Sequence, residues 1–85
     1  MMNKLSWETR LLQVIEADDH EPQNVMYGTR MRQVEDVLAR WRVSQEWWKS
    51  PIERDYYRVR LEGGIICELF RDLVTGNWHL QRVHD

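Results

Sequence analysis

The strongest constraint on the fold is an alternation of side chains at residues 55–61. One face carries Tyr57, Val59 and Leu61 and the other Tyr56, Arg58 and Arg60, a period of two that is typical of a half-buried strand. Glu62-Gly63-Gly64 then predicts a hairpin turn, because glycine accepts a positive φ. Two more strands, at 65–71 and 77–83, are expected around a turn at 73–76. The C-terminal third therefore predicts a three-stranded antiparallel meander.

The N-terminal half gives weaker signals. Residues 11–16 suit a strand, 18–22 form a polar turn or loop, and a short strand at 25–27 is followed by Gly28, which suits a tight turn.

Residues 30–43 are ambiguous. Val34, Val37, Leu38 and Trp41 fall at the i, i+3, i+4 and i+7 positions of a helical stripe, which favours a helix at 31–42. A strand with one bulge would also bury these residues, and Gly28 stands where a hairpin would turn.

The predicted fold class is mostly β: one small domain over residues 1–85, with an antiparallel sheet or a partly closed barrel of five or six strands. Trp78 and Leu80 are expected to pack with Val59, Leu61, Leu69 and Phe70, or with their neighbours on one face.

Cysteine and histidine usage argues against disulfides and metals. Cys67 is the only cysteine, so no intrachain disulfide forms, and its apolar strand predicts a buried, inert thiol. His79 and His84 are five residues apart and would point to opposite faces of a regular strand. We therefore expect no metal, no cofactor and no catalysis. The start of the chain has no long apolar run, which predicts a cytoplasmic protein without a membrane span.

Charge and tryptophan indicate where a partner could bind. Net charge is −2, but residues 28–61 carry eight basic and five acidic side chains, a balance of +3. Tryptophan and arginine alternate in the same region, as they do where protein partners or single-stranded nucleic acids are held. The predicted binding residues are Arg40, Trp41, Arg42, Trp47, Trp48, Arg54, Tyr56 and Arg58.

Several short motifs recur in one known family. They include Tyr27-Gly28, Arg40-Trp41-Arg42, Glu46-Trp47-Trp48, Arg54 to Val59, Phe70-Arg71-Asp72, Gly76-Asn77-Trp78 and Leu80 to Asp85. From about Val25 onward the chain resembles this small, uncharacterised bacterial family, a domain of unknown function often encoded near the translesion DNA polymerase and its accessory proteins. Val25-Met26 and Thr29 depart from the pattern, since members carry an aromatic and a basic residue around the first turn.

Two functions follow as hypotheses. The resemblance implies a protein-binding accessory of bacterial DNA damage tolerance, whose partner would be a translesion polymerase component. The rival is a module that binds single-stranded nucleic acid by stacking on Trp and Arg. A chain this short, with this many aromatic residues, also favours a homodimer or a hetero-complex that covers exposed apolar surface.

Overall fold

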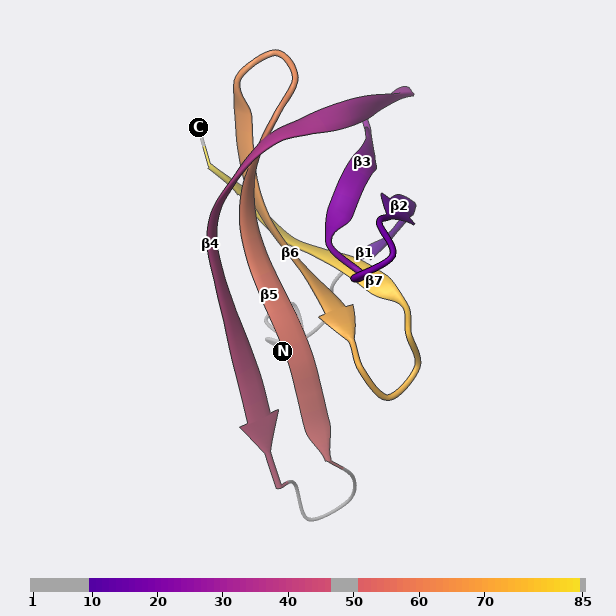
Figure 1. Cartoon of the computed structure of the whole chain (residues 1–85), viewed down its shortest axis with the longest axis vertical. Coiled ribbons are helices and arrows are strands. Elements are labelled where there is room, and N and C mark those ends of the chain that lie inside the picture. The colour runs from indigo at the N-terminus through magenta and orange to yellow at the C-terminus, as the bar shows by residue number, and fades with distance from the viewer. Residues whose placement is uncertain (1–9, 47–50, 85) are drawn as a thin grey trace, which may run out of the picture.

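The computed structural model describes residues 10–46 and 51–84. These residues form one antiparallel sheet with the strand order β1-β7-β6-β5-β4-β3-β2 (Figure 1). The strands are β1 (Arg10–Leu12), β2 (Val14–Glu16), β3 (Pro22–Tyr27), β4 (Arg30–Gln45), β5 (Ile52–Leu61), β6 (Ile65–Asp72) and β7 (Trp78–His84). The mostly β prediction is confirmed. The described ranges contain no helix of a length and apolarity that would cross a membrane.

The predicted C-terminal meander is formed by β5, β6 and β7. β5 pairs with β6 from Arg54 and Asp72 at one end to Leu61 and Ile65 at the other. Gly63 and Gly64 lie at φ values of 93° and 83° in the turn between them. The turn between β6 and β7 ends at Gly76, with φ 81°. Both turns therefore use the left-handed conformation that favours glycine.

Residues 31–42 lie within β4, so the helix predicted from their periodicity is wrong. Pairing between β4 and β5 shifts register twice, between Val34 and Asp36 and between Val37 and Ala39. A bulge changes the face to which the following side chains point. Val34 and Val37, three residues apart, therefore both pack against the same core, and their spacing imitates a helical stripe. The alternative of a bulged strand was correct, with two shifts in place of one. The expectation that it buries all four residues was wrong for Leu38 and Trp41, which are exposed.

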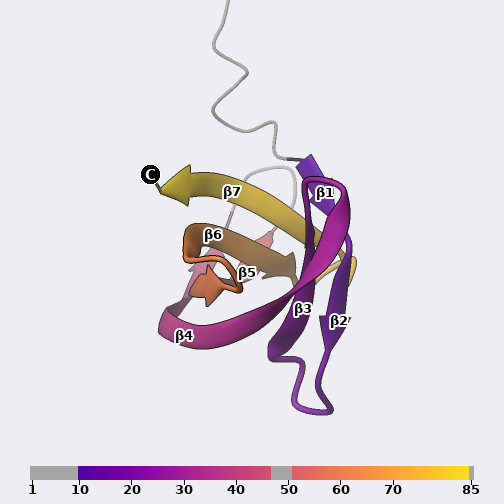
Figure 2. The same ribbon diagram turned by 90° about the horizontal axis from the view of Figure 1, so that it is seen from above.

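β1 and β2, the two end strands of the sheet, belong to one short segment of the chain, residues 10–16. β1 pairs with β7 and β2 pairs with β3, and between them the carbonyl of Gln13 accepts a hydrogen bond from the amide of Met26 at 2.9 Å. The segment 10–16 thus bridges two sides of the curled sheet, as the view in Figure 2 shows. The result is a curled, partly closed barrel, as predicted, with seven strands where five or six were expected.

The core fills the inner face of the curl. Its buried members are Val25, Tyr57, Val59, Leu61, Cys67, Leu69, Trp78 and Leu80. Trp78 and Leu80 therefore pack as predicted with Val59, Leu61 and Leu69. Phe70 is the exception, because it follows the inward-facing Leu69 in β6 and so points to the opposite, outer face. Its side chain is nevertheless only 1% exposed.

Candidate functional site

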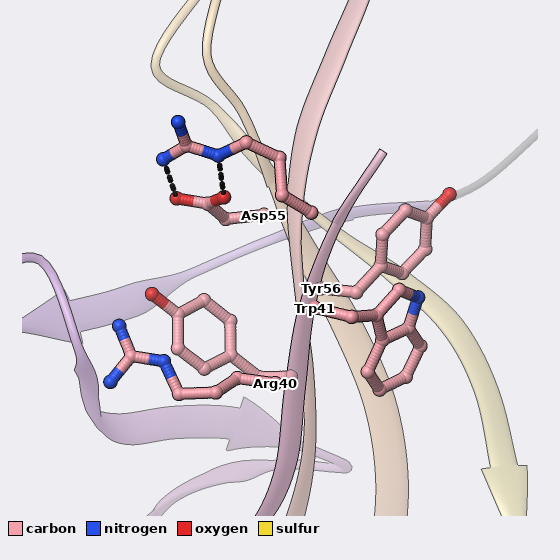
Figure 3. A pocket seen from close by; sticks show the side chains of 6 residues that line it. Arg40, Trp41, Asp55 and Tyr56 are labelled. Carbon is pink, nitrogen blue, oxygen red and sulfur yellow. Dashed lines mark hydrogen bonds and ion pairs between the residues drawn. The ribbon is translucent and has the colours of Figure 1, made fainter. Parts of the chain in front are cut away.

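Most of the predicted binding residues lie on the hairpin formed by β4 and β5. The structure places six of them there: Arg40, Trp41, Arg42, Arg54, Tyr56 and Arg58. Trp47 and Trp48 lie outside the described residues. The hairpin divides the six between two faces. Figure 3 shows Trp41 and Tyr56 on one side of the strand pair and Arg40 on the other, with Asp55.

β4 has a strand on only one side for most of its length. β3 pairs with it at 30–33 alone, whereas β5 pairs with it as far as Gln45. Within the described residues, 34–45 therefore has no paired strand opposite β5, and this side faces outward at the left of Figure 1. Pairing with β5 is uninterrupted from Ala39 to Gln45. We call residues 39–45 the open edge. At every second residue of this segment, the backbone N–H and C=O groups both point away from β5.

An aromatic row crosses the outer face from the open edge inward. Trp41, Tyr56, Phe70 and His79 occupy neighbouring positions on β4, β5, β6 and β7. The Trp41 and Tyr56 rings stack with centroids 5.3 Å apart, and Phe70 lies 5.0 Å from Tyr56 and 4.9 Å from His79. Burial lowers the pKa of His79, which favours its neutral ring. Exposure rises to 38% at Trp41, so the row is open to solvent at its β4 end.

Two arginines of β5 hold this row in place. The Arg54 guanidinium lies 4.4 Å from the centre of the Phe70 ring, and Arg54 Nη1 donates a hydrogen bond to the Tyr56 hydroxyl at 3.1 Å. Arg58 lies over Trp41 at 5.9 Å from the ring centre. Such contacts between cations and aromatic faces stabilise the packing of the row.

The inner side of the hairpin is polar near the open edge. Arg42 donates two hydrogen bonds to Asp55, from Nε at 2.6 Å and from Nη2 at 3.0 Å. Arg40 Nη1 lies 3.3 Å from the carboxylate of Glu21, and its guanidinium lies over the Tyr57 ring. The hydrogen bond from Arg42 holds the pKa of Asp55 below its usual range. A hollow beside these groups is lined by Arg40, Trp41, Arg42, Asp55, Tyr56 and Tyr57 (Figure 3).

Most arginines of the hairpin are paired with carboxylates of the same chain. The pairs are Arg30 with Glu62, Arg40 with Glu21, Arg42 with Asp55, Arg58 with Glu68, and Arg60 with Glu35 and Asp36. Arg32 and Arg54 have no such partner among the described residues. The basic balance of the central sequence is thus largely offset in the fold by carboxylates of the same chain.

A buried carboxylate at Glu68 is the polar feature that the sequence analysis missed. Glu68 is 6% exposed and lies 2.7 Å from Arg58, 3.5 Å from Arg82 and 3.1 Å from His84. Burial raises its pKa, but the hydrogen bonds from Arg58 and the contact with His84 outweigh burial and leave it below the usual value.

The two histidines of β7 lie on the same face, contrary to the prediction. His79 pairs with Phe70 and His84 with Ile66, and a register shift between these pairs reverses the alternation. No group of three His, Cys, Asp or Glu side chains within 10–46 and 51–84 is arranged to hold a metal ion. Cys67 is fully buried, as predicted, and burial raises the pKa of its thiol to about 11.

Leu38 and Phe70 are further residues of this region that the sequence analysis did not assign to a site. Leu38 is 44% exposed beside the open edge, and its place in an apparent helical stripe concealed its exposure. Phe70 supports the outer face, and only the register of β6 against β5 reveals that role.

Comparison of the chain with protein-family models, with curated proteins and with solved structures found no match in any of the three.

Proposed function

We propose that the chain is a non-catalytic protein-binding module that takes up an extended segment of a partner at the open edge of β4. The observation that carries this proposal is the regular strand at 39–45, which has β5 on one side and no strand on the other among the described residues. Unpaired N–H and C=O groups along such an edge are able to add a strand from another chain.

The side chains at and beside the open edge support the proposal that this edge binds a partner and is not merely exposed to solvent. Natural sheet edges are usually protected by bulges, prolines or charges. The two bulges of β4 lie before Ala39, and residues 39–45 contain neither a bulge nor a proline. Their two charged residues, Arg40 and Arg42, are each paired with a carboxylate of the same chain. Trp41 and Leu38 expose apolar surface at this place, and tryptophan is a frequent anchor of protein interfaces.

The proposed cellular setting comes from the sequence resemblance. We propose that the module serves bacterial DNA damage tolerance in the cytoplasm, with the translesion polymerase or one of its accessory proteins as the partner. The motifs that carry the resemblance include Arg40-Trp41-Arg42 at the open edge and Arg54 to Val59 on the strand that supports it.

A site-specific photo-crosslink tests the proposal. A photoreactive amino acid placed at Leu38, beside the open edge, should form a covalent adduct with a partner protein in the cells that make this chain. The same amino acid at Val74, which is 64% exposed in the turn between β6 and β7, is the matched control. A repair protein captured from position 38 alone, and more strongly after DNA damage, is the expected result. The absence of any adduct at 38 contradicts binding at this edge.

Single-stranded nucleic acid remains a second candidate because of the aromatic row. Each base stacked on an exposed ring contributes roughly 1–3 kcal/mol to binding. Of the row, Phe70 is buried and Trp41 offers the most exposed ring surface, and the neighbouring arginines are mostly paired. This candidate predicts quenching of tryptophan fluorescence by an oligonucleotide, with an effect that fades as salt rises. An unchanged spectrum at low salt removes it.

A further inference from the structure

We infer that the segment bound at the open edge is acidic and belongs to a different protein. It would present carboxylates beside Arg40 and Arg42 and apolar side chains beside Trp41 and Val43. This inference rests on the proposed function and adds the chemistry of the partner to it.

The charges of the open edge all have one sign. Arg40 and Arg42 are the only charged residues within 39–45, and both lie on the inner side of the strand. Their side chains are 60% and 61% exposed. A guanidinium has five N–H donors, and each of these two contacts one carboxylate of the chain itself. Donors therefore remain for a second carboxylate arriving on an added strand.

The outer side of the same edge is apolar. Trp41 and Val43 alternate with the two arginines, so a strand added beside them would meet basic groups on one face and apolar groups on the other. Directly opposed side chains in an antiparallel pair lie about 4.5–5.5 Å apart at Cβ, close enough for an ion pair or an apolar contact. The complementary segment alternates acidic and apolar residues.

A second copy of this chain is a poor occupant. In a two-fold antiparallel pair one residue lies opposite itself, and a centre at Trp41 sets Arg40 opposite Arg42 of the other copy. A centre at Arg40 sets the Arg40 side chains of the two copies opposite each other, and a centre at Arg42 does the same for Arg42. Like charges directly opposed across strands are destabilising. Registers that bring Asp36 toward these arginines run through the bulge between Val37 and Ala39, where a continuous ladder is interrupted. Centres at Val43 or Ser44 set Glu46 opposite Arg40 or Arg42, but Glu46 lies beyond the end of β4 at Gln45.

Two matched peptides test the chemistry on the full-length chain. Both carry valine at alternate positions, with glutamate between them in one and lysine in the other, and N-methyl groups on one edge prevent their self-association. Binding is followed by tryptophan fluorescence and by amide chemical shifts. We expect the glutamate peptide to bind at least ten-fold more tightly than the lysine peptide, to shift amides within 38–45, and to weaken as salt rises.

Substitution of Arg40 assigns the effect to the edge. Arg40→Gln should weaken binding of the glutamate peptide about 1.5- to 5-fold, the range for an exposed ion pair. Arg40→Glu should reverse the preference between the peptides. Arg30→Gln is the matched control, since Arg30 lies on the same strand with 56% exposure, where β3 covers the edge. Circular dichroism and thermal unfolding verify that each variant folds.

Three results would overturn the inference. They are equal or tighter binding of the lysine peptide, a concentration-dependent dimer whose contacts map to 39–45, and an oligonucleotide that shifts the same amides. If the Leu38 crosslink captures a partner while the glutamate peptide shows no preference, the partner chemistry is wrong and the proposed function stands. If the crosslink also fails, both are wrong.

Discussion

Replacing Phe70 by leucine removes the ring at the centre of the aromatic row and leaves an apolar side chain in its place. Three groups lose their partner: the Tyr56 ring at 5.0 Å, the His79 ring at 4.9 Å and the Arg54 guanidinium at 4.4 Å. Each aromatic pair is worth about 0.5–1.5 kcal/mol and a cation over a ring about 0.5–2 kcal/mol. We expect Phe70→Leu to reduce the free energy of unfolding by about 1.5–3 kcal/mol, since leucine retains much of the apolar burial.

The chain should remain folded after this change. A domain of 85 residues is expected to have a free energy of unfolding of roughly 4–13 kcal/mol. The loss at Phe70 corresponds to a fall in melting temperature of roughly 6–24 °C for a domain of this size. Phe70→Ala would reduce the free energy of unfolding by about 3–5 kcal/mol. A chain whose stability lies at the low end of the expected range would then unfold, so leucine is the more informative substitution.

Urea unfolding followed by tryptophan fluorescence measures the effect. Val74→Ala is the control, because this valine is 64% exposed and its truncation should change stability by less than about 0.5 kcal/mol. A double-mutant cycle with Tyr56→Leu should give a coupling energy of about 0.5–1.5 kcal/mol. A loss below about 0.5 kcal/mol for Phe70→Leu would refute the argument that the outer face holds a packed second layer.

Three further predictions concern single positions. Gly63→Ala should destabilise the turn between β5 and β6, because φ is 93° and the new Cβ would lie 3.0 Å from Arg32 Nη1; thermal unfolding checks this. The pKa of Glu68 is lower in the folded chain than its ordinary value of 4.5, so its contribution to stability is present above that value and lost as pH falls through the folded pKa. Acid unfolding of Glu68→Gln should accordingly show a weaker dependence on pH. Cys67 should react with a thiol reagent at the rate of unfolding, because the thiol is buried and its pKa is about 11; a fast reaction under native conditions contradicts this.

The sequence was informative wherever structure depends on near neighbours. Alternation at 55–61 correctly assigned the faces of β5, and Gly63, Gly64 and Gly76 marked turns that need positive φ. The candidate binding residues within the described ranges share one hairpin, because a hairpin brings residues close in sequence onto two adjacent strands, but it divides them between two faces.

The errors arose where a single extra residue changes the pattern. The bulge between Val34 and Asp36 placed Val34 and Val37 on one face and imitated a helix, and a register shift in β7 brought His79 and His84 to the same side. A bulge depends on the partner strand, so one segment read alone does not reveal it. Phe70 was misplaced because β6 is buried on both faces, and the groups that cover Phe70, the Tyr56 and His79 rings and the Arg54 guanidinium, come from adjacent strands.

The packed outer face also bears on the proposed binding at the open edge. Trp41 stacks on Tyr56, and Tyr56 is held in turn by Phe70 and by the hydrogen bond from Arg54. The Trp41 side chain is therefore largely ordered before any partner arrives, and the entropy lost on binding is smaller than for a freely rotating tryptophan. It follows that Phe70→Leu, although remote from the open edge, should weaken partner binding as well as stability. Packing of the outer face would thus hold Trp41 in an ordered conformation at the open edge before a strand is added.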